Sequence, residues 1–220
     1  MAGLRILCLH GYHGSAAVMR AQMRPLTAGW GSLADLVYVD APSLSAGDFG
    51  WWHAVQDEAS SGLANGPTPA RYVGWPRTRD EIVALFEQEE SFDGVLGFSQ
   101  GATLTSLLVG LRSPQGKPSA ERPLTFDFAI MVGGSLSRDP SHADLYQRRE
   151  CFDLPSLHLL GRRDIVVPAS QSRALSRRFS DPVVLEHEGG HLIAATPATR
   201  RHVAGFLEDM TARKRLCLQA

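Results

Sequence analysis

Six short apolar runs, separated by longer stretches with helical periodicity, constrain the fold of this chain more than any other feature of its sequence. The runs lie at residues 6–9, 36–39, 94–97, 128–132, 156–160 and 183–187. Four of them are apolar at every position, which is typical of parallel strands that are buried on both faces. Apolar residues at helical spacing mark residues 77–88, 102–111, 170–179 and 197–213. This alternation predicts an α/β fold with a mostly parallel sheet of about six strands and helices on both faces.

The size and composition of the chain favour a single soluble domain. A chain of 220 residues with a formal net charge of −1 fits one domain, residues 1–220, and offers no basic surface for nucleic acid. No apolar stretch approaches the roughly 20 residues that span a membrane. The three cysteines are far apart and odd in number, so we expect reduced thiols and a cytoplasmic location. The irregular segment 41–75, rich in Gly, Pro and aromatic residues, is expected to form a small lid beside a binding site.

A Gly-x-Ser-x-Gly sequence joins a predicted strand to a predicted helix. Ser99 stands between Gly97 and Gly101, directly after the apolar run 94–97 and before the apolar helix 102–111. A serine at the tip of such a sharp turn is exposed as a nucleophile, and glycine two residues on either side avoids collision with neighbouring backbone. A capping serine at an ordinary strand-to-helix turn is the alternative. The strand and helix on either side favour the nucleophile.

Two further residues complete a catalytic triad in the order Ser, Asp, His that this kind of turn accompanies. Asp164 lies in the loop that follows the run 156–160, and His191 follows two glycines after the last strand. His191 would remove the Ser99 proton during attack, and Asp164 would orient the imidazole and stabilise its cation. An aspartate that caps a turn is the alternative for Asp164.

The sequence from His187 to His191 also matches the zinc-binding pattern His-Glu-x-x-His. That chemistry needs both histidines on one face of a helix. Here two glycines disfavour a helix and a β-branched run leads in, so we predict a strand followed by a loop, with no metal site and no cofactor.

The loop after the first strand is expected to supply part of an oxyanion hole. Its sequence is His10-Gly11-Tyr12-His13-Gly14. Backbone N–H groups of Tyr12 and Gln100 would receive the negative charge that forms on the substrate carbonyl oxygen.

The motifs together resemble the FSH family of small serine hydrolases, which is related to the ovarian-tumour-associated hydrolase and to stand-alone thioesterases of fungal polyketide pathways. The matching segments are ILCLHGY at 6–12, YVDAP at 38–42, WW at 51–52, FDGVLGFSQGA at 92–102, PSLH at 155–158, GRRDIVVP at 161–168 and GGH at 189–191. The resemblance implies an α/β-hydrolase fold, the triad Ser99, Asp164 and His191, and cleavage of carboxylic esters or acyl thioesters. The family usually has a proline before the two glycines, and this chain has Glu188 there instead.

The resemblance leaves the substrate open. We expect Phe49, Trp51 and Trp52 to form an apolar wall over the acyl group, with His13 also in contact with the substrate, although Trp51 and Trp52 could equally pack on the core. The alternatives to a small-molecule esterase are a thioesterase or acyltransferase that takes its acyl chain from an acyl carrier protein and, more remotely, a binding protein that has kept the fold.

Overall fold

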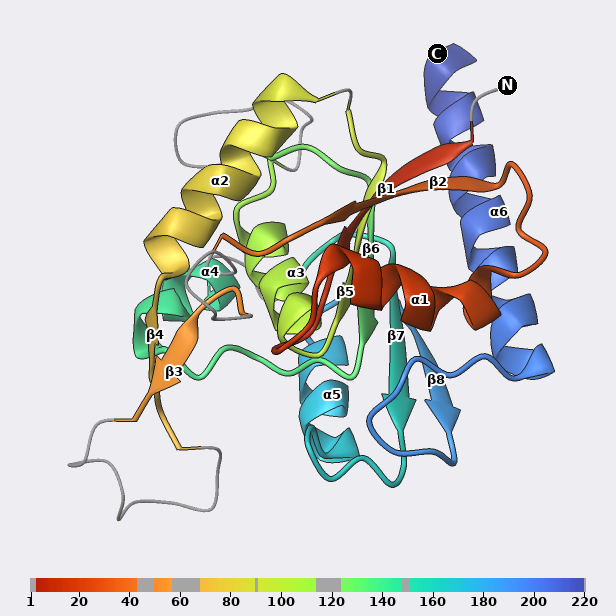
Figure 1. The fold of residues 1–220 in the computed structure, drawn as a ribbon. Helices are drawn as coiled ribbons and strands as arrows, with labels where there is room; N and C mark the ends of the chain where they lie inside the picture. The colour runs from red at the N-terminus through yellow and green to blue at the C-terminus, as the bar shows by residue number, and fades with distance from the viewer. Residues whose placement is uncertain are drawn as a thin grey trace.

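The core of the molecule is one six-stranded sheet in which every pair of neighbouring strands is parallel (Figure 1). The computed structural model describes residues 3–42, 50–56, 68–89, 91–113, 124–147 and 151–219. In spatial order the strands are β2 (Ala34–Val39), β1 (Leu4–Leu9), β5 (Gly94–Phe98), β6 (Phe128–Val132), β7 (Ser156–Gly161) and β8 (Pro182–His187). All six apolar runs are therefore strands, as predicted.

Helices cover both faces of this sheet, which confirms the predicted layers (Figure 1). Alternate residues of each strand point to opposite faces, and in β1 they divide between two cores. Leu7 and Leu9 pack in the core on the side of α3 and α5, whereas Ile6 and Cys8 pack in the core beneath α1 and α6. The helices are α1 (Ala16–Thr27), α2 (Trp75–Gln88), α3 (Gln100–Gly110), α5 (Ala169–Ser176) and α6 (Pro197–Gln219).

Some elements were not predicted from the sequence. Helix α1 connects β1 to β2, and the side chain of Ser15 caps its first turn by accepting a hydrogen bond from the Val18 N–H (3.1 Å). Strands β3 (His53–Val55) and β4 (Arg71–Val73) form a separate antiparallel pair. A short 3-10 helix (Pro140–His142) and α4 (Ala143–Gln147) follow β6.

The strand order predicts a binding site at the carboxyl ends of the central strands. The chain leaves β1 toward β2 on one side and later returns to form β5 on the other side of β1. The loops after β1 and β5 therefore separate at the carboxyl ends of these strands, which is where open parallel sheets bind ligands. None of the helices in the described part of the chain has the length and apolar character needed to span a membrane.

Candidate active site

Ser99 occupies the strained turn between β5 and α3 that the sequence predicted. Its φ of 56° and ψ of −117° lie in a region of backbone conformation that residues other than glycine rarely adopt. The Ser99 N–H donates to the Val132 carbonyl of β6 (2.8 Å), and the Ser99 carbonyl accepts from Ala102 and Thr103 at the start of α3. The turn is therefore fixed from both sides, and its side chain is held at the carboxyl edge of the sheet.

The two glycines around Ser99 are required by contact with backbone. A Cβ atom on Gly97 would lie 2.1 Å from the Gly101 carbonyl oxygen, and one on Gly101 would lie 2.1 Å from the Leu9 carbonyl oxygen. Both distances are far below van der Waals contact, so any side chain at either position would force β1, β5 and α3 apart.

The structure brings Ser99, His191 and Asp164 into one hydrogen-bonded chain. His191 Nδ1 lies 2.6 Å from Asp164 Oδ2, and His191 Nε2 lies 2.8 Å from Ser99 Oγ. Because the carboxylate can only accept, the proton of neutral His191 resides on Nδ1, and Nε2 accepts from the serine hydroxyl. A histidine placed this way can remove the Ser99 proton during attack on a carbonyl carbon.

Two features hold the acid and the imidazole in place. The second carboxylate oxygen of Asp164, Oδ1, accepts hydrogen bonds from the backbone N–H groups of Val166 (2.9 Å) and Val167 (2.8 Å). Gly133, which follows β6 with φ of 58°, leaves room for the ring: a Cβ there would lie 3.1 Å from His191 Cε1. Gly133 was not predicted from the sequence, although the pair Gly133-Gly134 directly after a buried strand was a signal for a close approach.

The expected donors of the oxyanion hole are the backbone N–H groups of Tyr12 and Gln100. Neither group has a hydrogen-bond partner within the described ranges. The two loops meet closely, since a Cβ on Gly11 would lie 3.1 Å from Ser99 Cβ.

His10 fixes the loop that carries Tyr12. Its Nδ1–H donates to the Gly11 carbonyl (2.7 Å), and its Nε2 accepts from the Ala41 N–H (3.0 Å). Burial lowers the pKa of His10, which favours the neutral ring that these two bonds require. Trp51 adds a third restraint, because its indole N–H donates to the His10 carbonyl (2.8 Å).

A cavity of about 530 Å³ opens beside Ser99, within the usual range for small-molecule sites. Its lining contains both apolar and polar side chains. The lining residues are Tyr12, Trp52, His53, Ala54, Tyr72, Ser99, Gln100, Thr103, Ser135, Arg138, Val166, Val167 and Gln171.

The predicted substrate-contacting residues have different positions. Trp52 lines the cavity and stacks on Tyr72, with ring centroids 4.5 Å apart. Trp51 does not line it; this residue is 1% exposed in the core, so the expected substrate contact is corrected to a packing role. His13 is exposed beside the Tyr12 ring and is absent from the described lining of the cavity. Phe49 lies outside the described residues.

Gln100 joins the nucleophile turn to the segment that carries Trp52. Its side-chain carbonyl accepts from the Trp51 N–H (2.9 Å), and its amide group donates to the Trp52 carbonyl (2.9 Å). The Gln100 amide therefore makes one accepting and one donating hydrogen bond with the backbone of residues 51–52, as the peptide group of a neighbouring strand would. The described part of segment 41–75 includes this held segment and the β3–β4 pair, and its role as a lid stays a prediction.

The β3–β4 pair is fastened to the loop after β6. The Tyr72 N–H donates to Asp139 Oδ2 (2.6 Å), and the Tyr72 hydroxyl accepts from the Arg138 N–H (2.9 Å). Burial disfavours a charge on Asp139, but its hydrogen bonds from Tyr72 and Ser141 outweigh burial and lower the pKa of the carboxyl. These bonds fix the part of the cavity wall that β3, β4 and the 133–139 loop form.

The region of the zinc-like pattern is a strand end and a loop, as predicted. Strand β8 ends at His187, and no helix forms before α6. Glu188 is exposed and accepts a hydrogen bond from Arg162 (3.0 Å).

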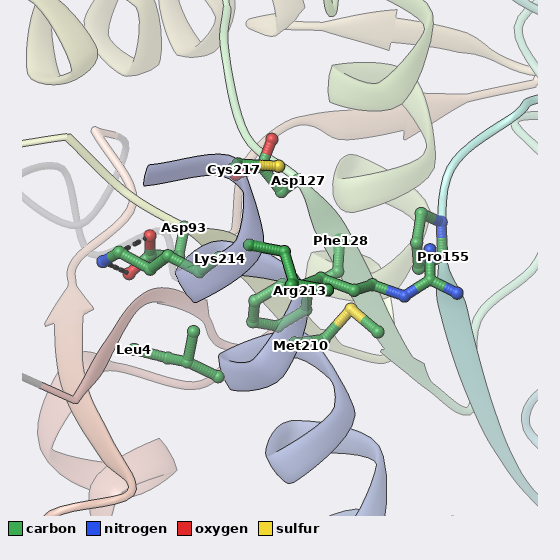
Figure 2. Close-up of a pocket in the computed structure, with 10 residues that line it drawn as sticks. Leu4, Asp93, Asp127, Phe128, Pro155, Met210, Arg213, Lys214 and Cys217 are labelled. Atoms are coloured by element: carbon green, nitrogen blue, oxygen red, sulfur yellow. Dashed lines mark hydrogen bonds and ion pairs between the residues drawn. The ribbon is translucent and has the colours of Figure 1, made fainter. Parts of the chain in front are cut away.

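A second cavity, of about 320 Å³, lies at the opposite edge of the sheet, between the amino ends of β1 and β6 and the end of α6 (Figure 2). Leu4, Phe128 and Met210 give it an apolar floor, and Asp93 pairs there with Lys214 (2.7 Å). Among the described lining residues there is no serine or histidine. The cavity beside Ser99 is therefore the candidate active site.

The fold and this site define an α/β-hydrolase. Solved structures with this fold include acyl-protein thioesterase 2 from Zea mays, with a TM-score of 0.64, 19% sequence identity and coverage of 96% of this chain and 94% of the other. Esterase PE8 superposes with a TM-score of 0.65 and 21% identity over 95% of this chain and 93% of the other.

The chain belongs to the serine hydrolase (FSH1) family, whose model matches residues 1–204. It is 33% identical to "Esterase OVCA2" of Xenopus tropicalis, over 93% of this chain and 92% of the relative. "Esterase C25G4.2" of Caenorhabditis elegans is 30% identical over 96% of each chain. The resemblance found in the sequence motifs is thereby confirmed.

Proposed function

We propose that this protein hydrolyses carboxylic esters or acyl thioesters through an acyl intermediate on Ser99. The observation that carries the proposal is the continuous hydrogen-bonded chain from Asp164 through His191 to Ser99 Oγ, with distances of 2.6 and 2.8 Å. Membership of a serine hydrolase family and the esterase relatives support the same chemistry.

The reaction proceeds in two halves. Ser99 Oγ attacks the carbonyl carbon while His191 Nε2 takes the hydroxyl proton, and the N–H groups of Tyr12 and Gln100 stabilise the oxyanion. The tetrahedral intermediate collapses, its carbon–oxygen or carbon–sulfur bond breaks, and His191 returns the proton to the departing alcohol or thiol. Water then attacks the acyl-Ser99 carbonyl, again losing its proton to His191, and the acid product leaves as Ser99 regains a proton.

A fluorophosphonate probe tests the proposal, because it reacts only with an activated serine. The wild-type protein should be labelled at Ser99 and should hydrolyse a neutral short-chain ester. Ser99→Ala should lose both properties. Ser135→Ala is the matched control, since this hydroxyl also lines the cavity but lies outside the triad.

Turnover that survives Ser99→Ala, or labelling at another serine, would contradict the assignment. Activity should also survive treatment with EDTA, because every step above uses groups of the chain itself. Activity that EDTA abolishes and zinc restores would favour metal-dependent hydrolysis instead.

A further inference from the structure

Arg138 is a fixed cationic residue in the wall of the active-site cavity. Its backbone is held on both sides: its N–H donates to the Tyr72 hydroxyl (2.9 Å), and its carbonyl accepts from the Ala70 N–H (3.0 Å). The guanidinium makes one long hydrogen bond, from Nη1 to the Thr68 carbonyl (3.4 Å). The backbone of Arg138 is therefore fixed, while most N–H donors of its guanidinium remain available to a ligand.

No carboxylate neutralises Arg138 within the part of the chain that the structure describes. Its neighbour Asp139 is directed elsewhere, with Oδ2 on the Tyr72 N–H and Oδ1 on the Ser141 N–H and hydroxyl. Other arginines in the molecule have acidic partners: Arg162 and Arg173 both pair with Glu186. The described lining of the cavity contains no aspartate or glutamate either.

A cationic cavity without a carboxylate favours an anionic ligand, and a guanidinium binds a carboxylate through paired hydrogen bonds. The same cavity also has apolar surface, which Trp52, Ala54 and the ring of Tyr72 contribute to its lining. This arrangement suits a chain that is apolar in the middle and negatively charged at its far end.

The lining of the cavity is compatible with the acyl side of the nucleophile. A leaving group must be next to His191, because this residue returns the proton to it. The described lining of the cavity includes Ser99 and both expected oxyanion-hole residues but not His191. We therefore place the acyl chain, which remains attached to the carbonyl, in this cavity.

We propose that Arg138 binds an anionic group at the far end of the acyl chain, so that the preferred substrates are monoesters or monothioesters of dicarboxylic acids. This inference rests on the function proposed above. Arg138 acts in binding and takes no part in bond breaking, so its removal affects charged substrates selectively.

The experiment compares matched esters with one leaving group. Monoesters of succinate, adipate, suberate and sebacate are each paired with the analogue whose far carboxylate is a carboxamide. At the best chain length, the wild-type protein should favour the carboxylate by about tenfold or more in kcat/KM, which corresponds to about 1.4 kcal/mol.

Two variants separate charge from shape. Arg138→Gln keeps hydrogen-bond donors but removes the charge, and it should lower kcat/KM for the carboxylate substrate until the ratio of carboxylate to carboxamide is about one. Arg138→Lys should retain part of the preference. Thermal unfolding of each variant checks that the fold is intact, as expected for a guanidinium that makes one long hydrogen bond.

A last arm uses neutral acyl chains on thiol leaving groups that carry a carboxylate. These should show no dependence on Arg138. A preference that appears only in this arm, equal rates for carboxylate and carboxamide in the wild type, or an unchanged ratio in Arg138→Gln would each overturn the inference. Absence of turnover of both the carboxylate and the carboxamide esters in the wild-type protein would instead contradict the proposed function itself.

Discussion

Replacing Gly133 with alanine tests whether the position of the His191 ring limits activity. The new Cβ would lie 3.1 Å from His191 Cε1, 3.2 Å from Nδ1 and 3.5 Å from Asp164 Oδ2. Carbon atoms pack best at about 3.5–4.0 Å, so the imidazole has to move by roughly half an ångström. Such a shift stretches the 2.8 Å contact between His191 Nε2 and Ser99 Oγ to the limit of a hydrogen bond.

The size of the effect follows from this displacement. A misplacement of about 1 Å can cost about a hundredfold in rate, so we expect roughly a tenfold loss in kcat/KM for a neutral ester. Alanine at φ of 58° also costs about 1–2 kcal/mol, partly offset by about 0.4–1 kcal/mol from the lower entropy of the unfolded chain. The free energy of unfolding should therefore fall by about 1 kcal/mol.

Two other glycines provide controls. Gly31 has φ of 55° with no atom within 4 Å of the added Cβ, so Gly31→Ala carries the same strain without touching His191. Gly205, in α6, has neither strain nor contact. Steady-state kinetics and chemical denaturation of all three variants separate strain from displacement. Activity of Gly133→Ala within twofold of Gly31→Ala would refute the reasoning.

Three further changes test the acid, the cavity wall and the core. Asp164→Asn keeps an acceptor for the two backbone N–H groups but loses the tautomer restraint, so kcat should fall by about 10⁴ with a near-normal melting temperature; near-normal turnover would identify another acid. Trp52→Ala should flatten the gain of about 0.8 kcal/mol per methylene along a series of acyl chains, whereas Trp51→Ala should leave that gain unchanged. Both side chains are buried, so each change should lower stability by about 3–5 kcal/mol, and identical chain-length profiles for both would contradict the distinction. Burial lowers the pKa of His158 from 6.5 to about 3, so the unfolded chain binds an extra proton between these values and stability falls as the pH falls through them. His158→Leu should reduce that fall in melting temperature, and an unchanged pH profile would show that other groups cause it.

The sheet could be predicted because four of its six strands contain a run that is apolar at every position and the other two are mostly apolar. Helix α1 was missed because only Met19, Met23 and Leu26 of this helix are buried, and Pro25 interrupts the pattern. A parallel pair such as β1 and β2 nevertheless requires a crossover connection, so the topology itself implied a helix there. The antiparallel pair β3–β4 has three residues in each strand, too few for alternation to be visible.

The site was predictable to the extent that local sequence determines it. Ser99, Asp164 and His191 each stand at a strand end, and the order of strands then brings their side chains together. The role of Arg138 depends on which loops meet, so it carries no local signal, and the glycine pair at Gly133 indicates a close approach without saying to which residue. The different contacts of Trp51 and Trp52 were also beyond sequence, because both side chains are buried and only the packing of distant segments determines which of them lines the cavity.

The two hydrogen bonds made by the Gln100 side chain have a consequence for how this enzyme could be re-engineered. The residue whose backbone N–H we propose as an oxyanion donor also supports, through its side-chain amide, the segment that carries Trp52. A library that randomises Gln100 would alter turnover and acyl preference together, and gains in one would be masked by losses in the other. Arg138 and Tyr72 also line the cavity but lie on other loops and strands, away from the nucleophile turn. Diversity placed there would change selectivity while leaving the oxyanion hole intact, so these positions are the better starting point for directed evolution.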